Sequence, residues 1–368
     1  MATATTGLQT HIWNNNLKSM ILIAIYPFLI TGIVWACAMA FSFFSGMTPT
    51  PDGANNFASN TIANYWPMIF GGVAVWFVGA YLFHTKMIRH MAHSHPVTRT
   101  EEPELYNLFE NLCISVGLKT PRLEIIESHA RNAFASGIND KTFTVTVTRG
   151  LMQSLSKDEL EGVLAHELTH IMNRDVRLLI ITIIFTGMVG FAAQIAWSQL
   201  RYKMWFGGNR NSQKGNGGGM MIFLAIVAIL WIGYFATLFT RFALSRRREF
   251  MADAGAVQIT RNPDAMMRAL MRIAGKDQIP KIPGDIAMMC VENRVPFMGL
   301  FATHPPIEKR IKMLSQTTGF AIPNLPQLRP FHAPRAERED TIHPPENPRE
   351  NWTTRQRFKK RRNANPWR

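Results

Sequence analysis

Cysteine is nearly absent from this chain of 368 residues, which contains only Cys37, Cys113 and Cys290 and no CxxC pair. An odd number of widely separated cysteines argues against a disulfide framework and against a zinc site made of thiolates. The same usage fits a reducing compartment for the water-facing part of the protein.

Acidic residues are also scarce, with 25 Asp and Glu against 40 Lys and Arg and a formal net charge of +15. Residues 355–368 alone contain seven Arg and Lys and no acid. Three interpretations of this tail stay open: a solvated end without a partner, attraction to anionic lipid headgroups, and contact with nucleic acid or the ribosome. Because few aromatic residues are interleaved with the basic ones, we expect no specific nucleic-acid partner and place anionic lipids next after the solvated end.

Charged residues are missing altogether from four apolar runs, which cover residues 20–41, 65–83, 178–197 and 220–239. At a rise of about 1.5 Å per residue, a helix of each run would cross a hydrocarbon core about 30 Å thick. These runs are too long and too uniformly apolar for buried core helices, so the sequence predicts four transmembrane helices. The first run could also be a signal peptide, but its long leader and the second run that soon follows favour a retained helix.

The basic residues predict the topology of these helices. Asp52 and no Lys or Arg lies between the first two runs, whereas basic residues follow the second and fourth runs at Lys86, Arg89, Arg99 and Arg246–Arg248. The positive-inside rule then places residues 85–175 and everything after about residue 241 in the cytoplasm. One loop on the side predicted to be external disagrees with this rule, because it carries Arg201, Lys203, Arg210 and Lys214. Whether residues 178–239 fully span the membrane therefore stays open.

The segments between and after these hairpins predict mixed α and β structure. Residues 102–116 favour a helix, and the β-branched stretches 122–127 and 142–148 favour strands. Ser156 and Glu159 form a capping box that would begin a further helix. We divide the chain into an N-terminal transmembrane hairpin (1–84), the first part of a cytoplasmic domain (85–175), a second hairpin (176–243), the second part of the domain (244–326) and a basic, largely disordered tail (327–368).

The stretch "AHELTH" lies in the middle of that helix. His166 and His170 are four residues apart, so on a helix they project from one face and can bind one small ion. Zinc suits imidazole ligands, and a catalytic zinc site uses three protein ligands. Glu167 would then serve as general base. The alternative, two solvated histidines, is weakened by the apolar neighbours Ala165, Leu168 and Ile171.

The third ligand must come from elsewhere in the chain, and Glu249 in "RRREFMADAGA" is the candidate. Asp253, four residues later, would accept a ring N–H from a ligating histidine and so orient it. A salt bridge between Glu249 and a neighbouring arginine is an equally open interpretation. Two apolar runs separate Glu249 from the histidines, so both ends of that hairpin lie on the same side of the membrane.

Four motifs together resemble one known family: "NAFASG" (132–137), "AHELTHIMNRD" (165–175), "SRRREFMAD" (245–253) and "THPPIEKRI" (303–311). Their order and spacing, with the four apolar runs, are similar over roughly residues 15–315 to the membrane-embedded zinc metalloproteases of the HtpX heat-shock type, relatives of the CAAX prenyl proteases. The basic tail and the basic third loop depart from the family pattern and leave regulation in doubt.

The resemblance implies one Zn²⁺ per chain, held by His166, His170 and Glu249, with Glu167 as catalytic base and Asp253 beside a ligand histidine. It also implies that Asn132 and Ala133 lie on an edge strand that pairs with the substrate backbone. A further implication is that His304 and Arg310 stabilise the tetrahedral oxyanion. For these last two residues, a simple helix-capping role for the HPP turn remains an alternative.

These expectations describe an α+β, zincin-like metalloprotease domain joined to four transmembrane α-helices. The expected activity is hydrolysis of peptide bonds, and the expected partners are the lipid bilayer and polypeptides, above all misfolded or damaged membrane proteins. Two alternatives stay open: a narrowly specific processing protease, such as a prenyl-protein protease, and a non-catalytic membrane scaffold that uses the basic tail. Natural substrates, cleavage preference and oligomeric state cannot be read from the sequence.

Overall fold

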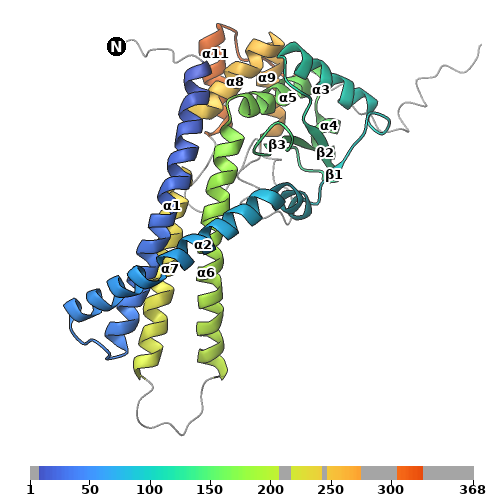
Figure 1. The fold of residues 1–368 in the computed structure, drawn as a ribbon. Helices are drawn as coiled ribbons and strands as arrows, with labels where there is room; N and C mark the ends of the chain where they lie inside the picture. Colours follow the sequence, from blue (N-terminus) through green and yellow to red (C-terminus); the bar gives the residue numbers. More distant parts are fainter. Residues whose placement is uncertain (1–7, 207–216, 243–246, 275–304, 326–368) are drawn as a thin grey trace, which may run out of the picture.

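The computed structural model describes residues 8–206, 217–242, 247–274 and 305–325, and it consists of long helices that carry a small α+β domain at one end (Figure 1). Along the chain the elements are α1 (Leu8–Phe44), α2 (Pro51–Ala92), β1 (His95–Pro96), α3 (Pro103–Ser115), β2 (Arg122–Ile126), β3 (Ala133–Ser136), β4 (Thr144–Thr148), α4 (Arg149–Ser154), α5 (Lys157–Met172), α6 (Asp175–Phe206), α7 (Gly217–Phe242), α8 (Arg247–Thr260), α9 (Pro263–Ile273) and α11 (Ile307–Thr318). The α+β class and the mostly helical architecture are as predicted.

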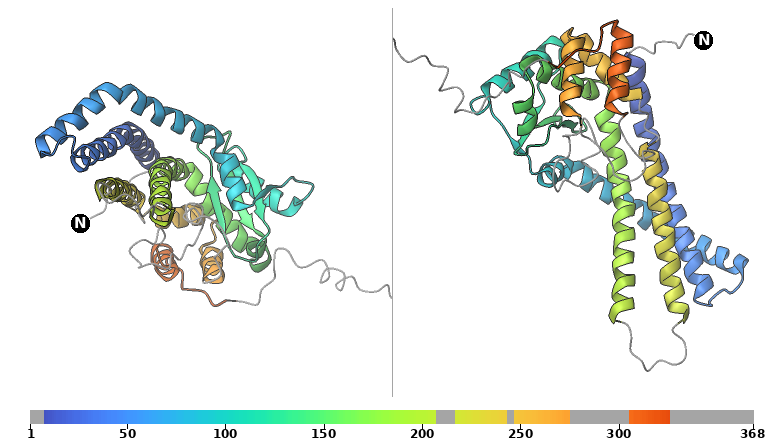
Figure 2. Two further views of the ribbon diagram at one scale, coloured as in Figure 1. Left: turned by 90° about the horizontal axis from the view of Figure 1, so that it is seen from below. Right: turned by 180° about the vertical axis from the view of Figure 1, so that it is seen from behind.

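Four of the described helices are long and apolar enough to cross a membrane, with spans at 15–44, 51–92, 175–202 and 219–238. Helices α1, α6 and α7 run side by side, and α2 packs against α1 and crosses the others obliquely (Figures 1 and 2). Many apolar side chains of α2 face outward, since Met68 is 73% exposed and Val75 is 74% exposed, whereas about half of the apolar stretch of α6 is buried among its neighbours. Such surfaces fit contact with lipid and not with water.

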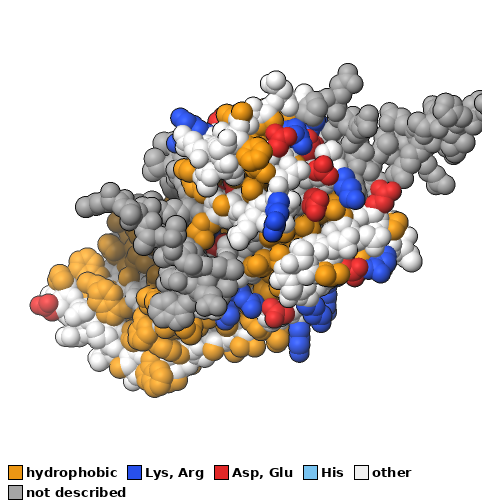
Figure 3. All heavy atoms as spheres, turned by 90° about the horizontal axis from the view of Figure 1, so that it is seen from above, with side chains coloured by type: hydrophobic (Ala, Val, Ile, Leu, Met, Phe, Trp, Pro, Cys, Tyr) orange, Lys and Arg blue, Asp and Glu red, His pale blue; other side chains and the backbone are white. Residues whose placement is uncertain are grey.

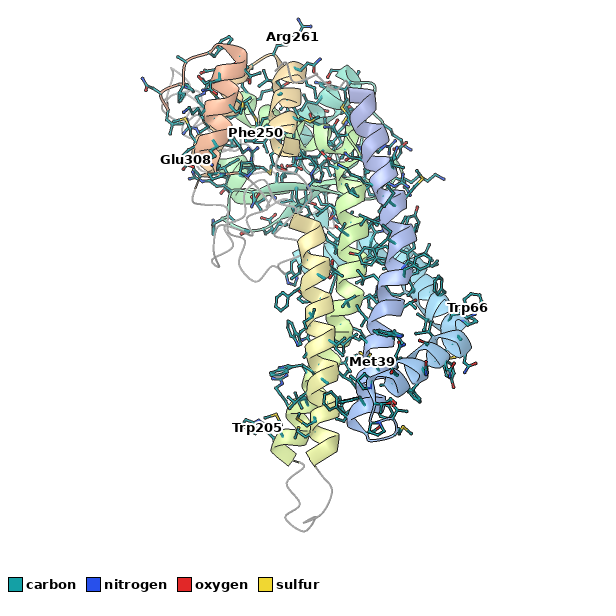
Figure 4. All side chains as sticks on the ribbon, turned by 90° about the vertical axis from the view of Figure 1, so that its left-hand side faces the viewer. Met39, Trp66, Trp205, Phe250, Arg261 and Glu308 are labelled. Atoms are coloured by element: carbon teal, nitrogen blue, oxygen red, sulfur yellow. The ribbon has the colours of Figure 1, made fainter. Side chains whose placement is uncertain are left out.

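Charge separates the two parts of the molecule. Hydrophobic side chains gather over the protruding helices, whereas Lys, Arg, Asp and Glu side chains lie mainly on the domain (Figure 3). Met39, Trp66 and Trp205 lie toward the end of the helices far from the domain, and Phe250 and Glu308 lie in the domain itself (Figure 4).

The sheet has the strand order β1-β2-β4-β3, with β2 and β4 parallel and β3 antiparallel to β4. Ile125 pairs with Val147, and Val147 pairs with Ala133, so one row of buried residues crosses the sheet. Helix α5 packs against β3, which is an edge strand of this sheet. The sheet thus supports the helix that carries the "AHELTH" stretch.

Helix α5 begins at the predicted capping box. The Ser156 hydroxyl accepts a hydrogen bond from the Glu159 N–H, and Glu159 Oε2 accepts one from the Ser156 N–H at 2.9 Å. At the other end, Arg174 adopts the left-handed conformation with φ of 61°, which is uncommon for residues other than glycine. The chain therefore turns sharply between α5 and α6, and the membrane helix starts directly beneath the end of α5.

Candidate metal centre

Helix α5 holds two imidazoles next to each other. The ring centroids of His166 and His170 are 4.8 Å apart and the rings are perpendicular. The side chain of His166 is 1% exposed and that of His170 is 13% exposed. Both rings therefore face the protein interior, as metal-ligating histidines need and solvated ones do not.

Helix α8 brings a carboxylate to the same point. Glu249 Oε1 lies 3.6 Å from His170 Nε2, and Glu249 Oε2 lies 3.7 Å from His166 Nε2. One ligand atom from each of the three residues lies within 4.8 Å of the other two. Atoms bound tetrahedrally to zinc at about 2.0 to 2.2 Å are about 3.4 Å apart. The donor set and its spacing therefore fit one zinc ion after small side-chain rotations.

Each imidazole is oriented by its own aspartate. His166 Nδ1 lies 3.0 Å from Asp253 Oδ1, and His170 Nδ1 lies 3.1 Å from Asp175 Oδ2. With Nδ1–H donated to a carboxylate, each ring presents Nε2 toward Glu249. Sequence reasoning named Asp253 for this role and missed Asp175. The only available signal for Asp175 was its position five residues after His170, because the turn at Arg174 that brings it back is not visible in the sequence.

Arg310 of α11 is buried beneath this cluster with 0% exposure. Its guanidinium donates to Asp253 Oδ2 at 2.9 Å through Nε and to Asp253 Oδ1 at 2.6 Å through Nη2. Its Nη1 lies 3.9 Å from Glu249 Oε2. Arg310 therefore ties α11 to α8 and holds Asp253 in place beside His166.

Charge in this cluster moves two pKa values in opposite directions. Burial lowers the pKa of His166, but hydrogen bonds to Asp253 and Glu249 outweigh burial and raise the pKa to about 9. Burial would raise the pKa of Asp253, but the Arg310 guanidinium and His166 lower it below its ordinary value. Asp253 thus stays ionised, and a metal ion must compete with a proton at His166.

The sequence profile of Peptidase family M48 matches residues 99–318, which include all of these residues. The chain belongs to peptidase family M48. Within the family it is similar to a "Protease HtpX homolog" of Bacteroides fragilis, with 41% identity over 324 residues that make up 84% of this chain and 98% of the relative. A second "Protease HtpX homolog", from Ligilactobacillus salivarius, is 36% identical over 62% of this chain and 78% of its own length.

Among solved structures, the crystal structure of S. mikatae Ste24p matches with 19% identity and a TM-score of 0.40, covering 82% of this chain and 66% of that one. The sequence relationship makes the protein an HtpX-type M48 metalloprotease, and the four apolar helices make it a multi-pass membrane protein. The recognition of the HtpX type from the four motifs is confirmed.

The other predicted site residues of this M48 member lie around the centre or outside the described residues. Glu167 is 2% exposed and follows His166 on α5. Ala133 is the first residue of β3 and Asn132 directly precedes it. The Asn132 carbonyl accepts a hydrogen bond from the Thr148 N–H at 3.0 Å, on the side of β4. His304 lies outside the residues that the structure describes.

Proposed function

We propose that this protein is a zinc-dependent endopeptidase of the inner membrane, with its catalytic domain in the cytoplasm. The supporting observation is the convergence of His166, His170 and Glu249 on one point, with ligand atoms within 4.8 Å of one another. Two imidazoles and one carboxylate suit zinc and leave a coordination position open. The domain divisions predicted from the sequence at 84, 175, 243 and 326 belong to this proposal.

In the proposed reaction, His166, His170 and Glu249 would hold a zinc ion, and bound zinc would supply Lewis-acid chemistry by polarising the scissile carbonyl and lowering the pKa of the attacking water. Glu167 accepts the proton from that water and passes it to the leaving amine. Glu167 directly follows the proposed ligand His166 on α5 and is buried, which fits this role.

Substrate binding by Asn132 and Ala133 is part of the same proposal. Strand β3 contributes one edge to the sheet, and it packs against the helix that carries Glu167. A peptide added beside β3 would therefore run close to the base and the ligands. Stabilisation of the oxyanion by His304 and Arg310 stays a prediction, and the contacts of Arg310 with Asp253 support an additional role in orienting His166.

The proposed substrates are misfolded or damaged membrane proteins. A domain carried directly on four apolar helices reaches polypeptide segments close to the bilayer surface more readily than freely diffusing ones. A narrowly specific processing protease would differ by requiring one particular cleavage motif. Cleavage of several unrelated membrane reporters would support the proposed action on misfolded or damaged membrane proteins in general.

Replacement of Glu167 by glutamine tests the proposal, because the amide keeps the shape of the side chain but cannot accept the proton. Detergent-purified wild type should contain about one zinc per chain and cleave casein or a membrane reporter. Glu167→Gln should retain the zinc and lose at least about 100-fold in rate, the lower range for loss of a general base. Retained cleavage by Glu167→Gln, or wild type without zinc, would refute the proposal.

A further inference from the structure

Asp175 lies where two membrane helices, α6 and α1, approach the metal centre. It is the first residue of α6, and it is only 3% exposed. Its Oδ2 faces His170 Nδ1 at 3.1 Å, and its Oδ1 accepts a hydrogen bond from Asn15 Nδ2 of α1 at 2.8 Å. A chain of two polar contacts therefore links α1 to His170.

Asn15 is held firmly enough to serve as such a link. Its side chain is buried, and the same Nδ2 also donates to the Asn173 carbonyl at 2.9 Å, at the end of α5. The amide thus bridges the last turn of the helix that carries His170 and the first turn of α6. The residues in contact are 158 and 160 positions apart in the sequence.

A third element approaches the same carboxylate. Arg248 of α8, the neighbour of Glu249, places its Nη1 3.9 Å from Asp175 Oδ1. Without the Asn15 amide, the buried oxygen Oδ1 would have to turn toward Arg248 or draw in water, because a buried carboxylate oxygen needs a donor. Either movement rotates Oδ2 away from His170.

We propose that Asn15 and Asp175 are positioning residues for His170, so that docking of the N-terminal membrane helix completes the metal centre. This inference rests on the proposed function, in which His170 is a zinc ligand. Asp175 fixes the tautomer and the ring orientation of His170, and Asn15 fixes Asp175. As a consequence, the domain binds zinc more tightly once α1 and α6 have packed together.

The test uses the full chain in detergent and measures zinc affinity by competition with a chromophoric chelator. Asp175→Ala should weaken zinc binding about 10- to 100-fold, as loss of a contact to a ligating histidine does. Asn15→Leu, which keeps the number and branching of the side-chain heavy atoms and removes the donor, should weaken it about 10-fold, at the lower end of that range. Ser19→Ala is the matched control, because the buried Ser19 hydroxyl donates to the Asn15 carbonyl on the same turn and does not touch Asp175. Its zinc affinity should equal that of wild type.

Exchanging the amide and the carboxylate between positions 15 and 175 distinguishes an effect on the orientation of His170 from an effect on helix packing. Asn15→Asp alone places two carboxylates in contact and should bind zinc most weakly. The double variant Asn15→Asp/Asp175→Asn restores a donor and an acceptor between the two positions, and the amide oxygen at 175 can again accept from His170. The Asn173 carbonyl stays without the donor that Asn15 gives it, so recovery is expected to be partial. It should bind zinc more tightly than Asn15→Asp, and the visible spectrum of its cobalt form should return toward that of wild type.

Equal zinc affinity of Asn15→Leu, Asp175→Ala and wild type would overturn the inference while leaving the proposed function intact. Equal weakening by Ser19→Ala, or no recovery in the charge exchange, would also overturn it, because the effect would then be one of helix packing. If wild type itself binds no zinc, the proposed function fails first.

Discussion

Removal of the Asp253 carboxylate should destabilise the protein far more than the loss of an exposed ion pair. In Asp253→Ala, the guanidinium of Arg310 loses two charge-assisted hydrogen bonds of 2.9 and 2.6 Å. The arginine is 0% exposed, so water cannot replace them. The ion pair of Arg310 with Glu249 remains, but its Nη1 lies 3.9 Å from Glu249 Oε2.

The magnitude follows from the burial of the pair. Removing one partner of a buried ion pair lowers the free energy of unfolding by about 3 to 5 kcal/mol, because the charge of the other partner remains in a poorly hydrated site. For a domain of this size, about 1 kcal/mol shifts the melting temperature by roughly 2 to 4 °C, so the expected fall is roughly 6 to 20 °C. Arg99→Ala provides the control, because Arg99 pairs with Glu110 at the surface and is 53% exposed. Loss of that pair should cost at most about 1 kcal/mol.

The assay is thermal melting of detergent-purified protein, followed by tryptophan fluorescence, with and without zinc. The double variant Asp253→Ala/Arg310→Met removes the stranded charge and should recover at least half of the lost melting temperature, since an apolar replacement for a buried pair is close to neutral. An Asp253→Ala protein that melts within about 2 °C of wild type, below the shift of a single kcal/mol, would refute this reasoning. So would a double variant as unstable as the single one.

Four further predictions concern the same centre and the helix that supports it. Zinc binding at pH 7.5 should release about one proton from His166, because its pKa of about 9 leaves it protonated without metal. The heat of zinc binding, measured by calorimetric titration, should therefore differ between buffers of different ionisation enthalpy. Identical heats would contradict the prediction. Because the pKa of His166 is raised on folding, its protonated form stabilises the metal-free protein. This contribution should be complete below the unfolded pKa of about 6.5 and lost as the pH rises through about 9. Melting temperatures of the metal-free protein measured across that pH range test this. Gly255→Ala should lower the free energy of unfolding by about 1 to 3 kcal/mol and weaken zinc binding, because the added Cβ would lie 2.5 Å from Thr169 Cγ2 and push α8 away from α5. Adding Thr169→Ala to this variant should relieve the clash. An unchanged melting temperature in Gly255→Ala would argue against close packing at this position. Ser156→Ala should lower the free energy of unfolding by about 1 kcal/mol through loss of the N-terminal cap of α5, which corresponds to a fall of roughly 2 to 4 °C in the melting temperature. A fall above roughly 10 °C would contradict a purely local capping role for Ser156.

Hydropathy predicted the existence of the four long helices, but not where they begin and end. The second apolar run covers residues 65–83, whereas α2 extends over 51–92. Its start is set by Thr50, whose side chain accepts from the Gly53 N–H, and its end by the left-handed His93. Apolar composition reports only the part of a helix that matches the hydrocarbon core, while caps and turns decide the remainder.

Local sequence was sufficient wherever the deciding contacts are short in range. The capping box, the alternating strand 144–148 and the spacing of His166 and His170 each depend on residues at most five positions apart, so their pattern can be read directly. The pairing of those histidines with Glu249 required the resemblance to a family, because 79 residues separate Glu249 from His170.

The sequence by itself determined the membrane helices, the helical histidine pair and the family. Only the tertiary structure decided that Asp175 orients His170, that Asn15 reaches Asp175 from α1, and that Arg310 is buried against Asp253. The physical reason is that the direction of a side chain hydrogen bond depends on how whole helices dock. A left-handed turn at Arg174 and the packing of α1 on α6 bring those groups together, and neither leaves a periodic signal in the chain.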